Sequence, residues 1–160
     1  MRALWITAAV IFLADQASKW TIVEWMNLKE LGRIDVLPPL LTFQMAWNEG
    51  INFGLFSSAG DARRWILILV GLVITLLVLR WVRAEKMGRW GMISGGLMVG
   101  GALGNVLDRV VWGAVADFLN MSCCGFQNPY SFNIADIAIF AGAIGLILFG
   151  PKKPKDDKTP

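Results

Sequence analysis

Four long apolar segments, separated by more polar ones, are the main pattern along this chain. They cover about residues 3–26, 65–82, 90–112 and 132–149. A helix needs about 20 consecutive apolar residues to cross the hydrocarbon core of a bilayer, and each segment comes near that length. The pattern therefore predicts a membrane α-helical fold with four transmembrane helices.

A different periodicity marks the stretch between the first two apolar segments. Residues 41–48 largely alternate apolar and polar side chains, and Asn48-Glu49-Gly50 has a composition typical of a turn. Alternation with a period of two predicts a short strand, so we expect a small β segment outside the membrane on the outer side. The charged, proline-rich residues 151–160 are predicted to be a disordered tail. The chain as a whole, residues 1–160, is predicted to form a single domain.

The composition supports integration into a membrane. Hydrophobic residues make up 56% of the 160-residue chain, only 17% of its residues are charged, and the mean hydropathy is +0.55. An ordinary soluble protein of this size is less apolar. The net charge is +3, but the basic residues lie at the chain ends and between apolar segments rather than in a patch with interleaved aromatics, so no nucleic-acid partner is expected.

The distribution of Lys and Arg predicts the orientation. Basic residues cluster near Arg2, between the second and third apolar segments, and in the C-terminal tail, whereas the last loop on the other side, residues 113–131, has none. Because Lys and Arg stay preferentially on the cytoplasmic side, four spans with both termini in the cytoplasm fit best, although the first external loop does hold some basic residues. Tryptophans mark the same boundaries, with Trp25, Trp65 and Trp112 at the outer interface and Trp5, Trp81 and Trp90 at the inner one.

The scarcity of other reactive residues limits the catalytic mechanisms that this chain could use. The chain has no histidine and only two cysteines, the adjacent Cys123 and Cys124. Serine-histidine-aspartate triads, cysteine-histidine dyads and histidine-containing zinc sites are therefore excluded. The cysteines are predicted to be plain thiols, because neighbouring cysteines join only through a strained ring. Hydrolysis, if it occurs, must depend on carboxylates or lysine.

Several polar groups nevertheless lie inside the apolar segments. Asp15 and Lys19 are four residues apart in the first one, which favours an ion pair on one helical face; that pair serves either to tolerate two charges in lipid or to support a site. The glycines of the third segment are spaced for close helix packing. That packing does not account for Asn105, Asp108 and Arg109, which need partners there; Asn105 and Arg109 share a helical face.

Asp117 and Asp136 lie at the facing ends of the third and fourth segments, at similar depths near the outer surface. Each has a structural alternative: Asp117 as an exposed loop acid, and Asp136 as a first-turn acid in a helix capped by Asn133. Two carboxylates held close together share a proton, so one can act as acid while the other acts as base. The sequence thus places a candidate acid–base pair at the outer interface.

The ordered motifs of the chain resemble the lipoprotein signal peptidases, also called signal peptidase II, which are aspartic peptidases of bacterial inner membranes. The motifs are Asp15-Gln16-x-x-Lys19, Asn48-x-Gly50 with Phe53-Gly54, Gly101-x-x-Gly104-Asn105-x-x-Asp108-Arg109, Val115-x-Asp117-Phe118 and Phe132-Asn133-x-Ala135-Asp136. Together they span nearly the whole chain. One departure is Asn52, which stands where a small residue is usual before Phe-Gly.

The resemblance implies an endopeptidase that removes the signal peptide from diacylglyceryl-modified prolipoproteins, cutting on the amino side of the lipidated cysteine at the periplasmic face of the inner membrane. It assigns catalysis to Asp117 and Asp136, without metal or cofactor. It assigns supporting or substrate-binding roles to Asn48, Gly50, Asn105, Arg109, Asn133, Asp15 and Lys19. It also implies inhibition by the cyclic lipopeptide globomycin. Membrane lipids are expected partners, and the chain is expected to be a monomer.

A small proton-coupled transporter is the rival function, with Asp117 and Asp136 as proton carriers. Transporters of that kind place their acids near the middle of the membrane and are often built from inverted repeats. The acids here lie at the surface and no such repeat is visible in the sequence. The peptidase is therefore the favoured interpretation.

Overall fold

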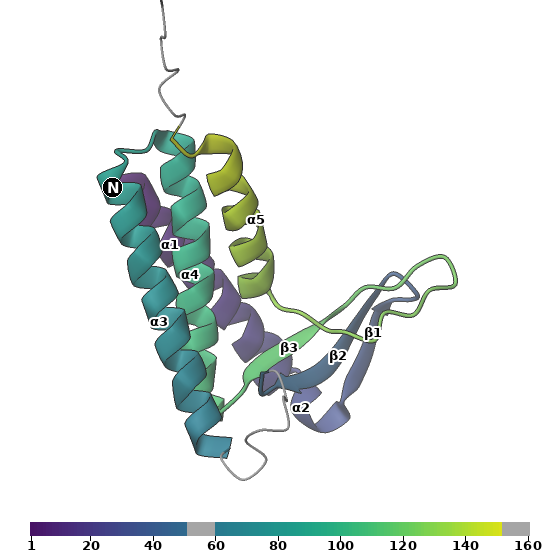
Figure 1. Ribbon diagram of the computed structural model, residues 1–160. Helices are drawn as coiled ribbons and strands as arrows, with labels where there is room; N and C mark the ends of the chain where they lie inside the picture. The colour runs from purple at the N-terminus through teal and green to yellow at the C-terminus, as the bar shows by residue number, and fades with distance from the viewer. Residues whose placement is uncertain (51–59, 152–160) are drawn as a thin grey trace, which may run out of the picture.

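A computed structural model describes residues 1–50 and 60–151 as a bundle of helices with a β-sheet arm at one end (Figure 1). The predicted tail from residue 152 onward and the Phe53-Gly54 motif lie outside the described residues. The bundle helices are α1 (Arg2–Lys19), α3 (Gly60–Ala84), α4 (Arg89–Trp112) and α5 (Ile134–Phe149). A π-helix, Trp20–Trp25, continues α1, and a single turn, α2 (Leu28–Leu31), follows it.

The helix boundaries lie close to those of the predicted apolar segments. Within the described residues, three helices are long and apolar enough to cross a membrane: Arg2–Trp25, Ala62–Ala84 and Arg89–Trp112. Within the apolar segment from about 132, α5 itself begins at Ile134, because Phe132 pairs with Leu119 beside the sheet and Asn133 caps the helix. The 16 residues of α5 therefore span only about 24 Å at 1.5 Å per residue.

Helix α4 lies at the centre of the bundle and packs against α1, α3 and α5. Its glycines permit this, as the sequence predicted. A Cβ atom added at Gly100 would lie 2.5 Å from the carbonyl oxygen of Ala8, and one at Gly101 would lie 2.5 Å from that of Ala135. Both neighbours are backbone atoms, so α1 and α5 approach α4 more closely than any side chain would allow.

Gly101→Ala is therefore expected to lower the free energy of unfolding by about 1–3 kcal/mol, the usual cost of overpacking a tight interior. Gly88→Ala is the matched control, since a Cβ atom there meets nothing within 4 Å. Thermal unfolding of both variants in detergent measures the difference. Equal midpoints for the two variants would show that α4 and α5 are not in backbone contact at Gly101.

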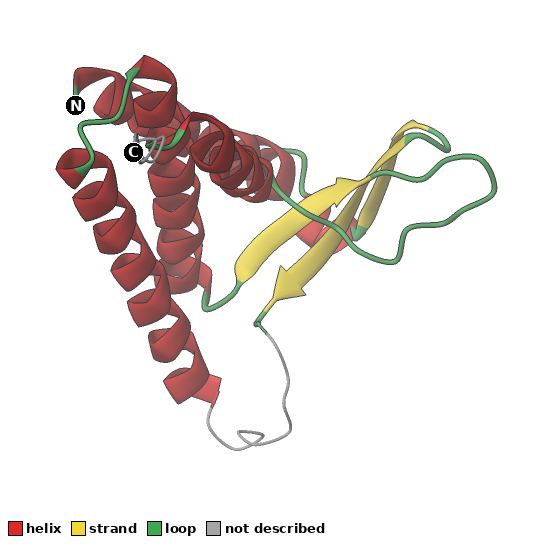
Figure 2. Ribbon diagram, turned by 45° about the horizontal axis from the view of Figure 1, so that its top comes forward, coloured by secondary structure: helices red, strands yellow, loops and turns green. Residues whose placement is uncertain are grey.

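The arm is an antiparallel sheet whose strands, β1 (Arg33–Leu37), β2 (Leu41–Asn48) and β3 (Val115–Asn120), lie in the order β1-β2-β3 among the described residues (Figure 2). The predicted strand at 41–48 is confirmed. The sequence did not reveal β1 or β3. Phe118 of β3 packs edge-on against Phe43 at 5.9 Å and is buried with Val23 and Leu28, which fixes the sheet to the end of the first helical segment.

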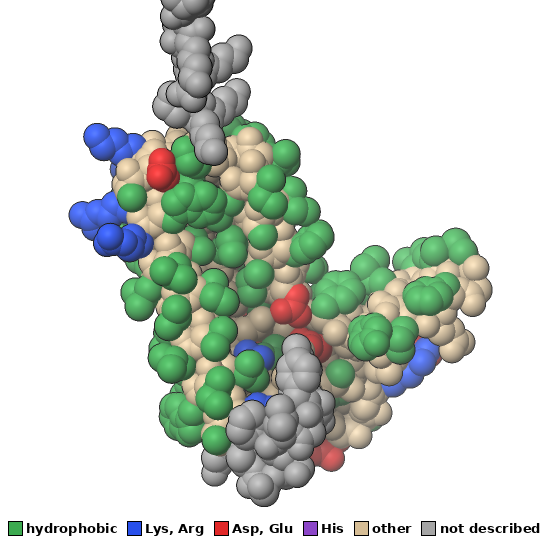
Figure 3. Space-filling view, viewed as in Figure 1, with side chains coloured by type: hydrophobic (Ala, Val, Ile, Leu, Met, Phe, Trp, Pro, Cys, Tyr) green, Lys and Arg blue, Asp and Glu red, His purple; other side chains and the backbone are tan. Residues whose placement is uncertain are grey.

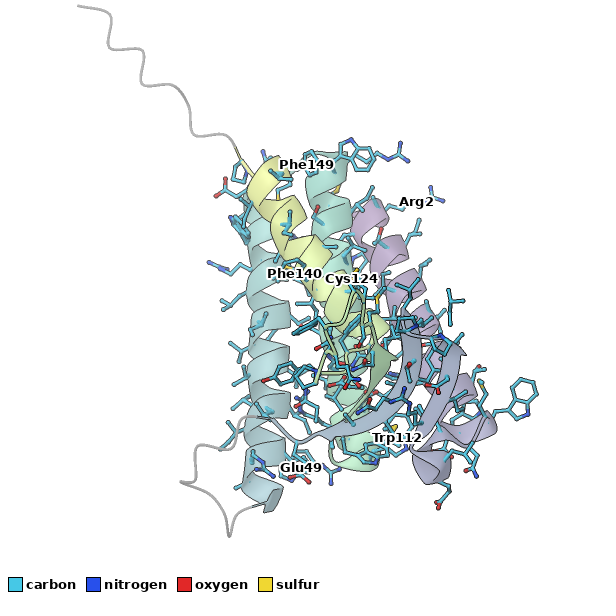
Figure 4. All side chains as sticks on the ribbon, turned by 90° about the vertical axis from the view of Figure 1, so that its right-hand side faces the viewer. Arg2, Glu49, Trp112, Cys124, Phe140 and Phe149 are labelled. Atoms are coloured by element: carbon cyan, nitrogen blue, oxygen red, sulfur yellow. The ribbon has the colours of Figure 1, made fainter. Side chains whose placement is uncertain are left out.

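The surface of the bundle agrees with a membrane environment. Hydrophobic side chains cover much of its visible side, and one group of Lys and Arg side chains lies at the end that carries the N-terminus, with others nearer the sheet (Figure 3). In Figure 4, Arg2 and Phe149 lie at that end, and Glu49 and Trp112 lie at the other, near the sheet. Side chains such as Leu69, Phe140 and Ile147 are largely exposed on the helices, as expected for residues that face lipid.

Candidate active site

Asp117 and Asp136 come from different elements but are held by a shared set of asparagines. Asp117 lies on β3, and its Oδ1 accepts a hydrogen bond from Asn133 Nδ2 at 2.6 Å. Its Oδ2 accepts one from Asn48 Nδ2 at 3.0 Å. The side chain is only 3% exposed. The alternative that Asp117 is an exposed loop acid was therefore wrong, because pairing with β2 buries the residues that follow α4.

Asp136 lies in the first turn of α5, where Asn133 caps the helix as the sequence suggested. Asn133 Oδ1 accepts from the Asp136 main-chain N–H at 2.9 Å, and Asp136 Oδ2 accepts from the Asn133 N–H at 3.3 Å, which forms a capping box. The other oxygen, Oδ1, accepts from Asn105 Nδ2 at 2.9 Å. Capping thus uses one carboxylate oxygen of Asp136, and the second faces α4.

The two asparagines also join the carboxylates to one another. Asn133 Nδ2, which contacts Asp117, lies 3.2 Å from Asn105 Oδ1, and Asn105 donates to Asp136. Asn48 is oriented in turn by the N–H of Gly50, which donates to Asn48 Oδ1 at 3.0 Å. With that oxygen occupied, the amide nitrogen of Asn48 points to Asp117. Four of the predicted supporting residues therefore contact the pair or orient a residue that does.

Beneath the pair lies a buried ion cluster. Lys19 Nζ is 2.8 Å from Asp15 Oδ2 and 2.6 Å from Asp108 Oδ2, and all three side chains are fully buried. The predicted pairing of Asp15 with Lys19 is confirmed. Lys19 also donates to Asn105 Oδ1 at 3.3 Å, so the cluster is connected to the asparagines above it.

Each acid of this cluster holds the backbone immediately before one of the candidate aspartates. Asp15 Oδ1 accepts from the N–H of Ala135, the residue before Asp136, at 3.0 Å. Asp108 Oδ2 accepts from the N–H of Ala116, the residue before Asp117, at 3.2 Å. Lys19 neutralises the charge of these two acids. It therefore fixes the two carrier segments, which are the segments that carry Asp117 and Asp136, relative to each other. Asp108 was not among the predicted site residues, although a charge inside an apolar segment signals a need for a partner.

Arg109 lies one helical turn beyond Asn105, as its spacing predicted. Its Nη1 donates to the Asn105 carbonyl oxygen at 3.1 Å, while its buried Nε has no hydrogen-bond partner in the described part of the chain. Arg109 and Asn105 line a cavity of about 220 Å³ between α3, α4 and α5. The other lining residues are mainly apolar, including Leu67, Ile74 and Ile139.

The surroundings of Asp117 favour its protonated form. Burial is the largest cause and the negative charge of Asp136 adds to it; together they raise the pKa of Asp117 from 3.8 to about 6, against the opposing effects of its two asparagine donors and of Lys19. A carboxyl group with such a pKa can hold or release a proton near neutral pH. Residues 1–50 and 60–151 contain no cluster of three or more potential metal ligands.

Comparison with known proteins matches this chain to an enzyme family. The family model described as signal peptidase (SPase) II matches residues 7–150. The chain belongs to the signal peptidase II family. A lipoprotein signal peptidase of Methylobacterium radiotolerans is 38% identical, covering 99% of this chain and 92% of that protein. Another, of Methylorubrum extorquens (strain PA1), is 41% identical over 76% of this chain and 72% of that protein.

Solved structures agree on the fold. A bacterial membrane enzyme solved by the in meso method at 2.3 Å superposes with a TM-score of 0.76 at 25% identity, covering 92% of this chain and 87% of the other. A second, at 1.9 Å, gives a TM-score of 0.80 at 24% identity over 96% of both chains. The protein, as a member of the signal peptidase II family with this fold, is thus a multi-pass membrane protein. It is mostly helical and has a small antiparallel sheet.

Proposed function

We propose that this member of the signal peptidase II family is an aspartic endopeptidase that removes the signal peptide from diacylglyceryl-modified prolipoproteins. The cut falls on the amino side of the lipidated cysteine. The observation that carries the proposal is the joining of Asp117 and Asp136 through Asn133 and Asn105, within a chain of this family. The aspartic mechanism is inferred from that geometry.

In the proposed reaction the pair begins with one proton between its two carboxyl groups. The ionised aspartate takes a proton from water, and the water oxygen attacks the carbonyl carbon before the lipidated cysteine. The protonated partner polarises the carbonyl oxygen. Collapse of the tetrahedral intermediate transfers a proton to the leaving cysteine nitrogen and breaks the C–N bond. The pair supplies acid and base itself, so the proposed reaction uses no metal or cofactor.

The membrane position of the site suits this substrate. Asn105, which holds Asp136, lies seven residues before the end of α4 at Trp112, or about 10 Å along the helix axis. We place this end at the periplasmic face of the bacterial inner membrane, with four spans and both termini in the cytoplasm. A signal peptide that crosses the membrane as a helix then presents its cleavage point at this depth, while its acyl chains stay in lipid.

The cavity between α3, α4 and α5 offers room for the apolar part of the substrate. Arg109, whose Nε lacks a partner among the described residues, is suited to bind a main-chain carbonyl oxygen there. Because Thr42 and Phe43 of β2 already pair with both β1 and β3, the part of this segment proposed to clamp the peptide by strand pairing is residues 46–50. The chain is proposed to act as a single-domain monomer, and globomycin, by resemblance, is expected to compete with the substrate.

The test is cleavage by the purified protein in detergent of a lipidated prolipoprotein and of the same precursor with serine in place of the lipidated cysteine. Cleavage of the lipidated precursor alone, with a product that begins at the modified cysteine, supports the proposal. The rival transporter predicts no cleavage and a proton flux in proteoliposomes that is lost when both aspartates become asparagine.

The cleavage rate is expected to depend on pH through Asp117. One proton must remain on the pair, so kcat/KM should fall as the pH rises past the pKa of about 6 at Asp117, by about tenfold per pH unit. Asn48→Ala removes a donor that stabilises the ionised form of Asp117, and it should therefore move this fall to higher pH. A flat profile from pH 5 to 9 for both proteins would contradict the assignment.

A further inference from the structure

Cys123 and Cys124 form a close dithiol in the loop that joins β3 to α5. They are the only cysteines of the chain, both are exposed free thiols, and Cys123 Sγ donates to Cys124 Sγ at 2.7 Å. We propose that this pair is a reversible modification site, which low-molecular-weight or protein disulfides oxidise to a vicinal disulfide. The proposal is independent of the proposed peptidase function.

The backbone brings the two sulfur atoms together. The Phe126 N–H donates to the Cys123 carbonyl oxygen at 2.9 Å, which closes a four-residue turn. Its two central residues, Cys124 and Gly125, have positive φ angles of 58° and 84°, as in a type I′ turn. The S–S bond of a disulfide is about 2.0 Å long. Closure therefore requires the sulfur atoms to approach by about 0.7 Å, a small side-chain movement.

The disulfide between Cys123 and Cys124 should form reversibly rather than be a permanent structural cross-link. Cα atoms of neighbouring residues are about 3.8 Å apart, whereas ordinary disulfides join Cα atoms about 4.4–6.8 Å apart. The ring is therefore strained, and strained, exposed disulfides are the ones most easily reduced. The structure shows both cysteines as free, exposed thiols, which is the reduced form of the pair.

The exchange balances in two steps. The Cys124 thiolate attacks one sulfur of the external disulfide, forming a mixed disulfide and releasing one thiol. Cys123 then loses its proton to solvent and attacks the Cys124 sulfur, releasing the second thiol. Its hydrogen bond to Cys124 raises the pKa of the Cys123 thiol, which leaves Cys124 to attack first. Two cysteine thiols are oxidised and one external disulfide is reduced to two thiols.

Contacts at the base of the loop separate this turn from the aspartate pair. Asn120 Nδ2 donates to the carbonyl oxygens of Asn128 and Tyr130 at 2.8 and 3.0 Å, and the Asn128 N–H donates to Ser122 Oγ at 3.0 Å. Closure of the ring should therefore change the turn and its exposed Phe126 while leaving the segments that carry the aspartates in place. Modification can then be measured without reference to activity.

The test uses the full-length protein in detergent, treated with oxidised glutathione, quenched with acid and alkylated. Mass spectrometry of the loop peptide should show loss of two hydrogen atoms, no added glutathione, and restoration by dithiothreitol. Phenylarsine oxide, which bridges two neighbouring thiols, should bind the reduced protein and block this oxidation. The matched variants Cys123→Ser and Cys124→Ser should instead keep a stable glutathione adduct and bind the arsenical weakly.

Three results would overturn the proposal. One is a wild-type protein that accumulates glutathione adducts as the single variants do. Another is oxidation that yields dimers at a rate dependent on protein concentration. The third is a pair that stays unmodified when folded but reacts after denaturation.

Discussion

Asp117→Asn and Asp136→Asn are each expected to reduce kcat for cleavage of a lipidated prolipoprotein by about 10³-fold, within the range that general acid–base catalysis contributes. The double variant should lose little more than either single one, because the two carboxyl groups act as one unit and either loss disables it. Asparagine keeps the size of each side chain and an oxygen that accepts a hydrogen bond. Initial rates at saturating substrate measure the effect.

Two controls accompany these variants. Asp35→Asn alters an acid of the same sheet whose side chain is 50% exposed and paired with Arg33, and it should leave kcat unchanged. Thermal unfolding in detergent shows whether Asp136→Asn retains the fold despite its place in the capping box of α5. The contrary result would be folded single variants whose losses of kcat differ and whose activation free-energy changes add in the double variant. That result would show that the two aspartates act separately.

Lys19→Met is expected to lower the free energy of unfolding by about 3–5 kcal/mol, the usual cost of removing one partner from a buried ion pair. The substitution leaves Asp15 and Asp108 facing each other with no counter-ion from Lys19, and both are fully buried. Lys29→Met is the matched control. It breaks the more exposed pair with Glu24 and should cost no more than about 1 kcal/mol.

A second measurement separates loss of the ion pair from loss of packing. The triple variant Asp15→Asn, Lys19→Met, Asp108→Asn removes all three charges, so it should be more stable than Lys19→Met alone. Urea or thermal unfolding of the four proteins in one detergent provides the comparison. Similar stabilities for Lys19→Met and Lys29→Met would contradict the role of the cluster in holding α1, α4 and the two carrier segments together.

The sequence predicts most of the elements that local patterns determine. Long apolar runs predicted the bundle helices, and alternation of apolar and polar residues predicted β2, because both patterns are formed by residues close together in the sequence. Residues 115–120 escaped prediction as a strand because nearly every position of β3 is buried, which removes the alternation. The pairing of Phe132 with Leu119, just before α5, was not predicted, because that partner is distant in sequence.

The site was predictable in its residue types but not in its connections. Asp117 and Asp136 stood out as acids at the ends of apolar segments, and Asn133 as a helix cap. No local rule shows that Asp15 binds the N–H of Ala135, or that Asp108 binds that of Ala116. Those contacts join α1 and α4 to residues that follow them by 120 and 8 positions, and they exist only once the helices have packed.

The most direct test of the account is the initial rate at which purified wild-type protein and the folded double variant Asp117→Asn, Asp136→Asn release the signal peptide from a lipidated prolipoprotein, side by side in one detergent. The account predicts cleavage on the amino side of the lipidated cysteine by the wild-type protein, and a rate for the double variant that is about 10³-fold lower, or slightly lower still. Cleavage at the same bond by the folded double variant, at a rate comparable to wild type, would contradict it.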